Sequence, residues 1–246
     1  MTPEQAAAAA KPAVLALGNA FSDDPKTMRR ARQIGLTGWA FYVAGRGGAL
    51  GNVRADTVAA ALGFIAPEAV QDGWDAACKV APPEEIAAQN LAECCRWGRE
   101  HLAGFYGLAR LVELAERVVV SAEAAGMPLF AAWRSMPLPD DDAPGARAAV
   151  LAHLLREHRG QAHLLAIRAS GLTPLEAIIA GPEGDTGATA FGWQPPFPPY
   201  EPLVRRRSWA EALTDRIAGD AFRALAPAER TDLVDLLDAA LEAVRS

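Results

Sequence analysis

Two of the four histidines of the chain lie in one short segment that is rich in proton-transferring and anion-binding groups. The segment is Arg156-Glu157-His158-Arg159-Gly160-Gln161-Ala162-His163. An imidazole beside a carboxylate can act as a general acid or base, and nearby guanidinium groups can stabilise developing negative charge. We therefore take His158, Glu157, Arg159 and His163 as candidate catalytic residues of a cofactor-independent acid/base enzyme.

The helical periodicity of this segment predicts where the two histidines point. A turn of about 100° per residue places His158 in the middle of an apolar stripe, whereas Arg159 and His163 share another side of the helix. The stripe is formed by Leu151, Leu154, Leu155, Ala162 and Leu165. We expect His158 to be buried and paired, because an unpaired buried polar group costs roughly 1–3 kcal/mol.

Three other roles for His158 stay open at this point. It can be a core histidine bonded to a carbonyl, or the lone axial ligand of a haem, because one buried imidazole suffices for either role. A zinc site formed with His163 is disfavoured, since the two side chains point about 140° apart around the helix and cannot chelate one ion. The sequence predicts no metal site, and the cofactor stays unknown.

A second segment offers groups that could bind a substrate. Trp39 and Tyr42 precede Arg46 in an aromatic-rich stretch that continues into the glycine-rich run Gly45–Gly51. The planar Arg46 cation suits an anionic ligand group or an internal carboxylate such as Glu157, although it could equally cap a helix. The glycines do not form the dinucleotide fingerprint G-x-G-x-x-G, because a leucine occupies the last glycine's place before Gly51.

Composition and charge exclude several classes of partner. The net charge of −6 opposes non-specific attraction to nucleic acid or anionic membranes, and the basic run Arg205–Arg207 is expected to be a solvated turn. Three cysteines are too few for a disulfide framework, and no apolar run is long enough to span a membrane. We expect a cytoplasmic protein with a small-molecule partner, and leave a homodimer open.

Helix start and stop residues recur along the chain, whereas alternating β-branched runs are nearly absent, so the expected fold is a mainly α, multi-helix bundle with little or no β structure. Regions 127–144 and 181–207 are rich in proline and are expected to be irregular. Helices are expected at 26–33, 54–65, 67–78, 83–125 with breaks near Gly104 and Gly107, 145–170, 208–224 and 227–244.

The predicted elements suggest one helical domain over residues 1–246, which could also divide into 1–126 and 145–246. Residues 181–207 would then form a proline-rich insert or a lid. This insert carries Phe191, Trp193, Phe197 and Tyr200 among prolines that prevent a regular helix. We expect these rings to pack across the helical body, over the mouth of a pocket.

The two chemistry-bearing segments resemble an actinobacterial family of SalK-like or helix-turn-helix-like proteins. The resemblance rests on Gly38-Trp39, Tyr42-Val-Ala-Gly45-Arg46, Gly126-Met-Pro-Leu-Phe130, Pro137-x-Pro139-Asp140, Leu155-Arg-Glu157-His158-Arg159-Gly160-x-x-His163 and Thr214-Asp215-Arg216. The resemblance implies a winged-helix region after Gly171, but this chain has a short, proline-rich interval there, and it has Gln161 where the family pattern has an aspartate.

Retention of the His/Glu/Arg cluster without a basic recognition helix favours a function in a helical pocket over nucleic-acid binding. Our expectation is a small-molecule enzyme of secondary metabolism that catalyses addition, elimination, cyclisation or hydrolysis. One alternative is a non-catalytic ligand-binding protein or transcriptional regulator derived from a winged-helix family. A haem- or metal-binding protein acting through His158 is the second alternative.

Overall fold

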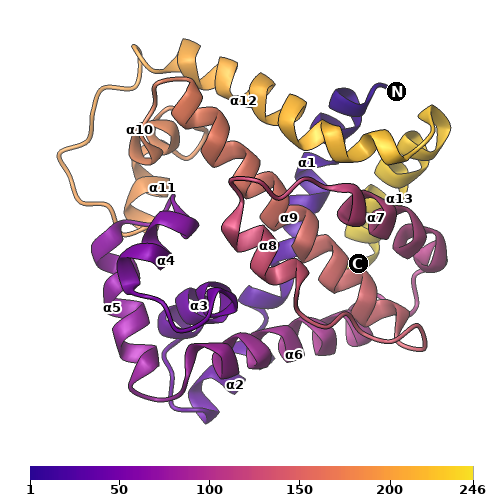
Figure 1. Cartoon of the computed structure of the whole chain (residues 1–246), viewed down its shortest axis with the longest axis horizontal. Coiled ribbons are helices and arrows are strands. Elements are labelled where there is room, and N and C mark those ends of the chain that lie inside the picture. Colours follow the sequence, from indigo (N-terminus) through magenta and orange to yellow (C-terminus); the bar gives the residue numbers. More distant parts are fainter. Residues whose placement is uncertain (246) are drawn as a thin grey trace.

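The computed structural model describes residues 1–245, and within that range the chain forms α-helices and three 3-10 segments, with no β-strand (Figure 1). The mainly α, multi-helix prediction is confirmed. The helices are α1 (Pro3–Asn19), α2 (Pro25–Gln33), α3 (Gly38–Gly47), α4 (Ala55–Leu62), α5 (Pro67–Cys78), α6 (Pro83–His101), α7 (Leu108–Ser121), α8 (Pro128–Arg134), α9 (Pro144–Ala169), α10 (Pro174–Ile179), α11 (Gly184–Ala190), α12 (Val204–Gly219) and α13 (Pro227–Arg245). The 3-10 segments are η1 (Ala20–Asp23), η2 (Gly48–Leu50) and η3 (Asp220–Ala224).

The longest helix, α9, runs through the centre of the bundle and packs against α1, α6, α7, α8 and α12 (Figure 1). Pro144 lies in its first turn, where backbone N–H groups form no intrahelical hydrogen bond, so a proline costs nothing there. Gly171, with φ +70°, follows the end of the helix. Most residues of α9 are buried, as is typical of a helix that neighbours cover on nearly all sides. Its side chains therefore reach several different parts of the molecule.

The alanine-rich helix α1 packs closely on α9, α12 and α13. It begins at a capping box in which Thr2 and Gln5 satisfy each other's backbone amides. Small residues allow the close approach: a Cβ added to Gly18 would lie 2.6 Å from the Cβ of Arg156. No element was expected at residues 3–19, because alanine gives little contrast between the faces of a helix.

Helices α3, α4 and α5 pack on one another and form a compact group at one side of α9, which we call the α3–α5 unit (residues 38–78) (Figure 1). Buried Val58, Val70 and Trp74 fill its interior. Gly63 makes the turn between α4 and α5 with φ +68°, a conformation that favours glycine, and Pro67 begins α5. Two helices joined by this short turn match the sequence prediction closely.

A second apolar cluster holds α10 and α11 against the C-terminal part of α9. Ile167 and Leu172 lie at its centre, and the side chains of Trp193 and Phe197 pack against it. The indole of Trp193 donates a hydrogen bond to the carbonyl of Phe64 at 2.8 Å. The expectation that aromatic rings of the insert pack across the body is confirmed for these two.

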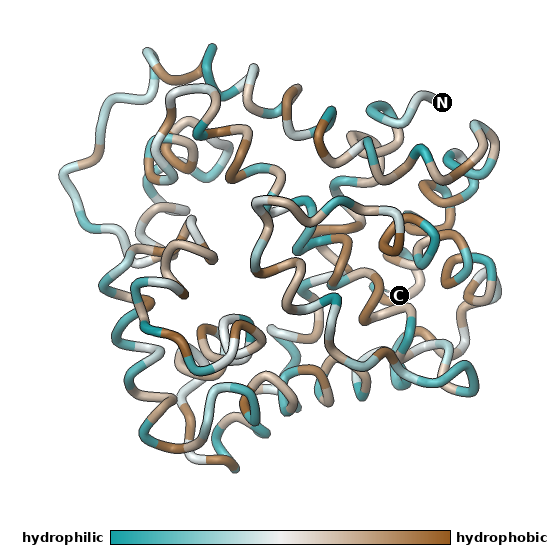
Figure 2. Tube along the Cα trace, in the orientation of Figure 1, coloured by the Kyte–Doolittle hydropathy of each residue, from teal (hydrophilic) through white to brown (hydrophobic). Residues whose placement is uncertain are grey.

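The remaining two aromatic residues of the insert behave differently from each other. Phe191 packs against the main core, as expected. Tyr200 is 55% exposed, so the prediction is wrong for this ring. In Figure 2 the loop after α11, which carries Tyr200, is coloured mostly hydrophilic, whereas α9 carries long hydrophobic stretches. Tyr200 therefore lies on a solvated part of the insert.

Two segments that were expected to be irregular contain helices. Residues 128–134 form α8 and residues 184–190 form α11. Pro128 lies in the first turn of α8, where proline favours the start of a helix. Helix α12 begins four residues before the expected start at Ser208, whose hydroxyl donates to the carbonyl of Val204 within the helix instead of capping it. Proline content alone was therefore a poor guide in both segments.

None of the helices within residues 1–245 is long and apolar enough to cross a membrane.

Candidate functional site

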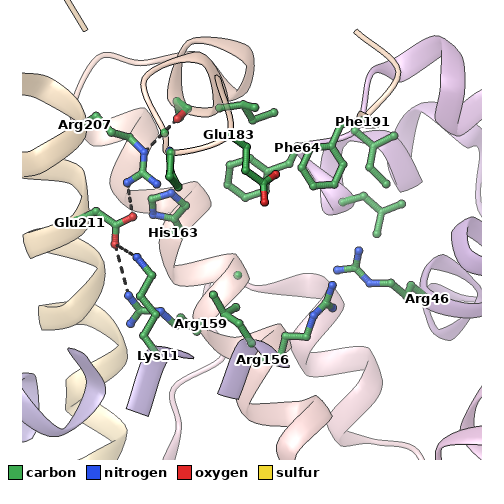
Figure 3. Close-up of a pocket in the computed structure, with 18 of the residues that line it drawn as sticks. Lys11, Arg46, Phe64, Arg156, Arg159, His163, Glu183, Phe191, Arg207 and Glu211 are labelled. Carbon is green, nitrogen blue, oxygen red and sulfur yellow. Dashed lines mark hydrogen bonds and ion pairs between the residues drawn. The ribbon is translucent and has the colours of Figure 1, made fainter. Parts of the chain in front are cut away.

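A cavity of about 370 Å³ lies against α9, between the α3–α5 unit and the α10–α12 region (Figure 3). Its volume falls within the range of small-molecule sites, about 300–1,000 Å³. Much of the lining is apolar and comes from Leu15, Leu62, Phe64, Ile65, Ile178 and Phe191. Five basic side chains also line it: Lys11, Arg46, Arg156, Arg159 and Arg207.

One wall of the cavity contains Tyr42, Arg46 and Arg156, and both arginines bind the buried carboxylate of Glu157; we call these four residues the arginine clamp. Arg46 binds the Glu157 carboxylate bidentately, with Nε and Nη2 each 3.0 Å from an oxygen. Arg156 donates to Oε1 of the same carboxylate at 2.6 Å. The hydroxyl of Tyr42 accepts hydrogen bonds from Arg46 at 2.9 Å and from Arg156 at 3.4 Å. Of the roles left open for Arg46, the structure shows the pairing with the internal carboxylate Glu157.

The charges of the arginine clamp reinforce one another. Burial would raise the pKa of Glu157, but Arg46 and Arg156 outweigh it and lower that pKa to about 2. Burial would also raise the pKa of Tyr42, and the same two arginines lower it. Glu157 is therefore a permanent carboxylate at neutral pH rather than a proton donor. Because two cations share one anion, the clamp retains one unit of positive charge.

A second group of ion pairs, which we call the Glu211 cluster (Lys11, Arg159, Arg207, Glu211 and Asp215), forms the opposite wall (Figure 3). Glu211 is bound by Lys11 at 2.9 Å, by Arg159 at 3.5 Å and by Arg207. Asp215 accepts a second bond from Arg159 at 2.8 Å. Burial would raise the pKa of Glu211, but the bonds from Lys11 and Arg207 lower it to about 2.

His163 lies beside the Glu211 cluster, half-buried, and its ring is fixed on two sides (Figure 3). The Thr214 hydroxyl donates to the carbonyl of Ala210 at 2.7 Å, so it accepts from Nδ1 of His163, also at 2.7 Å. This hydrogen-bond network assigns the imidazole proton to Nδ1 and leaves Nε2 with a lone pair. The ring stacks on Phe64 with centroids 5.5 Å apart. Burial, with a smaller effect of Arg207, lowers the pKa of His163 to about 4, so the ring is neutral at pH 7.

Three positions of α9 place the cavity along one face of that helix. Arg156, Gly160 and His163 are spaced i, i+4 and i+7, a pattern that puts side chains on the same face, and all three line the cavity. A Cβ added to Gly160 would meet no atom within 4 Å. The helix continues unbroken through this glycine. The cavity therefore reaches the bare backbone of α9 at Gly160.

His158, the residue expected at the centre of the site, lies on a different face of α9 and does not line the cavity. It is 4% exposed, so the prediction of burial is confirmed. Among the described residues its ring nitrogens form no hydrogen bond, and its neighbour is the Phe130 ring with centroids 4.9 Å apart. Burial, followed by the charge of Arg134, lowers its pKa to about 4. The expectation that the ring nitrogens of His158 are hydrogen-bonded is therefore wrong. The ring packs against an aromatic side chain instead.

His153, one turn before Glu157, was not a candidate. Its Nδ1 donates to the carbonyl of Gly18 at 3.1 Å, and its buried Nε2 has no hydrogen-bond partner among residues 1–245. Trp39 also lies off the cavity: its indole donates to the carbonyl of Ala69 at 2.9 Å and its ring stacks on Tyr42. The role of Trp39 is to position Tyr42.

The sequence predictions missed much of the second wall. Arg207 belongs to the basic run that was expected to be a solvated turn; instead it lies on α12, bonds to Glu211 and lines the cavity. Lys11, Glu211 and Arg156 were not singled out either. The spacing of Arg156, Gly160 and His163 is a pattern that could have located the cavity from the sequence. It places two polar residues and a glycine on one stripe of the predicted helix.

A family model described as a helix-turn-helix family matches residues 7–197. The chain belongs to this helix-turn-helix family. No curated protein and no solved structure matches the chain significantly. Within residues 1–245 no group of three or more His, Cys, Asp or Glu side chains is placed to hold a metal ion.

Family membership directs attention to α4 and α5, two helices joined by a short turn. In such a motif the second helix enters the DNA major groove and needs a surface that attracts phosphate. The solvent-exposed residues of α5 include Glu68, Asp72 and Asp75. These carboxylates would repel the phosphate backbone. In this chain α5 therefore lacks the charge expected of a recognition helix.

Proposed function

We propose that this member of the helix-turn-helix family binds a small, partly apolar organic anion in the cavity along α9. The arginine clamp carries this proposal. Its two guanidinium groups are held in place by one buried carboxylate, yet they retain N–H donors and a net positive charge. The Tyr42 hydroxyl accepts from both arginines, so its own proton is available to donate. A cluster that offers these remaining N–H and O–H donors beside an apolar cavity suits a carboxylate ligand.

The location of the cavity supports a sensing role for the bound ligand. Arg46 comes from the α3–α5 unit, Arg156 from α9 and Arg207 from α12, so a ligand would contact elements that are distant in the sequence. A ligand that contacts several elements stabilises the arrangement it binds. We infer a ligand-responsive protein, in line with the regulator alternative. The acidic face of α5 argues against nucleic-acid binding through that helix, so we do not include DNA contact by α5 in the proposal.

An acid/base enzyme is the second candidate, and His163 favours it. The ring is neutral, its Nδ1 proton is held by Thr214, and its free Nε2 lone pair can accept a proton, although the lowered pKa makes it a weak base. In this version His163 and Arg159, both on the cavity, replace His158 in the proposed chemistry, and Glu157 positions the arginines. Appearance of a product from a bound acid, detected by mass spectrometry, would favour the enzyme over the sensor.

The finer features that the sequence suggested remain proposals. These are the SalK-like assignment, an actinobacterial role in secondary metabolism and a cytoplasmic location. Haem or metal binding through His158 is not part of the proposal, because the His158 ring packs on Phe130 away from the cavity.

Titration calorimetry with matched acids and amides tests anion binding. Arylalkanoic acids should bind at least tenfold more tightly than their primary amides, because charge-assisted hydrogen bonds contribute about 1.5–3 kcal/mol. Arg156→Met should remove most of this preference while leaving the Arg46–Glu157 pair intact. Arg205→Met, which removes an exposed arginine from α12, is the charge-matched control and should bind like the wild type. Equal affinity for acids and amides, or equal losses in both variants, would contradict the proposal.

A further inference from the structure

The proposed anion site accounts for only one end of the cavity. Arg156 and His163 are separated by seven residues along α9, about 10 Å of helix, with Gly160 between them. Arg156 supplies hydrogen-bond donors, whereas His163 supplies an acceptor. The face of α9 formed by these residues therefore offers donors at Arg156 and an acceptor at His163, and a ligand that lies along this face should change polarity in the opposite sense.

We propose that the ligand is a flat aromatic acid that carries a hydrogen-bond donor, such as a phenolic hydroxyl, at the end remote from its carboxylate, and that Nε2 of His163 accepts that donor. This inference rests on the proposed anion-binding function and narrows its ligand class. The carboxylate would bind the arginine clamp, the flat body would lie over Gly160, and the hydroxyl would reach His163.

Gly160 supports the flat body. A glycine inside a helix destabilises it by roughly 0.5–1 kcal/mol relative to alanine. No protein atom lies within 4 Å of an added Cβ, so nothing in the described fold requires a glycine there. The space above its backbone belongs to the cavity, and the apolar residues Phe64, Ile65 and Phe191 also line it. A planar ring would use this space, and any larger side chain at this position would occupy it.

His163 supports the donor. Its Nδ1–H is committed to Thr214, whose own proton is committed to Ala210, and its Nε2 accepts no hydrogen bond from residues 1–245. The charged groups that face it from α1, α9 and α12 are Lys11, Arg159 and Arg207, all of which are paired with Glu211. Glu183, from the region of α11, is an exposed carboxylate at the edge of the cavity. His163 is thus the fixed, half-buried acceptor.

The test compares ring substituents on one acid scaffold. The probes are the ortho, meta and para isomers of (hydroxyphenyl)acetic and (hydroxyphenyl)propanoic acid, their methyl ethers and the unsubstituted parents, measured by titration calorimetry at pH 7. At least one hydroxy acid should bind tenfold or more tightly than its methyl ether and its parent. His163→Phe, which keeps a ring to stack on Phe64, should reduce that ratio to within twofold without weakening the parent acid. Glu183→Gln is the control and should keep the ratio.

Thr214→Val provides a second variant, because it removes the acceptor that holds the Nδ1 proton of His163 and should also reduce the ratio. Its effect acts through His163, so it should be absent in the His163→Phe background. Binding of the parent acids without any preference for a hydroxyl would overturn this inference and leave anion binding intact. A preference that survives in His163→Phe would overturn it as well. Failure of every acid to bind would instead overturn the proposed function.

Discussion

Three histidines of α9 have the same protonation state in different surroundings. In the core, His153 and His158 contact the rings of Trp133 and Phe130, at centroid distances of 4.5 and 4.9 Å. On the cavity face, His163 is held by Thr214 and stacks on Phe64. Burial lowers the pKa of all three to about 4. A depressed histidine pKa alone therefore does not identify a functional group, whereas access to a cavity and a fixed proton do.

Acidification should give the largest effect and should act on all three histidines together. Because the three folded-state pKa values of about 4 lie below the ordinary value of 6.5, the unfolded chain takes up protons first as the pH falls. Stability should be unaffected by these groups above pH 6.5 and should decrease between pH 6.5 and 4. The slope should approach three protons, about 4 kcal/mol per pH unit. Urea unfolding at a series of pH values measures it.

A variant distinguishes the contributions to this slope. His158→Leu should decrease it by about one proton, or roughly 1.4 kcal/mol per pH unit. The carboxylates Glu157 and Glu211, whose pKa values are lowered to about 2, should contribute only below about pH 4.5. A stability that stays constant from pH 6.5 to 5 would show that the three histidines are not held neutral by burial.

Loss of the Glu157 charge should have the next largest effect. In Glu157→Gln the two arginines of the clamp would lose their shared counterion, and Arg46 would become an unpaired buried charge. We expect the free energy of unfolding to decrease by about 3–5 kcal/mol at pH 7. Glu211→Gln is the matched control on the opposite wall: this residue is 27% exposed, so the loss should be smaller. Equal losses from the two substitutions would contradict the distinction between a buried clamp and a solvated cluster.

Most of the fold could be predicted from local chemistry. Asp24 caps the start of α2, Thr173 and Glu176 form a capping box at α10, and Gly35 and Gly171 follow helix ends with positive φ, because caps and turns depend on a few neighbouring residues. Helices α1 and α8 were missed although each has a local start signal. Thr2 and Gln5 form a capping box at the start of α1, and Pro128 lies in the first turn of α8. Both helices pack against α9.

The candidate site could be predicted only in part. The pairing of Arg46 with Glu157 followed from their chemistry, because a planar cation at a helix end and an inward carboxylate suit each other. The apolar stripe correctly predicted that His158 is buried. The residue lies in the core, however, and not at the cavity. Lys11 and Arg207 belong to helices at opposite ends of the chain. Their meeting at Glu211 depends on the packing of α1 on α12, which no local pattern reveals.

The most direct test of the account fills the cavity at Gly160 and leaves every charge unchanged. Gly160→Leu should place a side chain into the open space above α9, where nothing lies within 4 Å of the added Cβ. Leucine also favours the helix by roughly 0.5–1 kcal/mol over glycine, so stability should not decrease. Ala169→Leu adds the same side chain to an exposed position of α9 and is the control.

Calorimetric titration with the tightest-binding aryl acid gives the decisive measurement. Gly160→Leu should lower the affinity at least thirtyfold, about 2 kcal/mol, while urea unfolding should show a fold at least as stable as the wild type. Ala169→Leu should bind with wild-type affinity. Unchanged binding by a folded Gly160→Leu protein would contradict the central claim that the ligand lies along the Arg156, Gly160 and His163 face of α9.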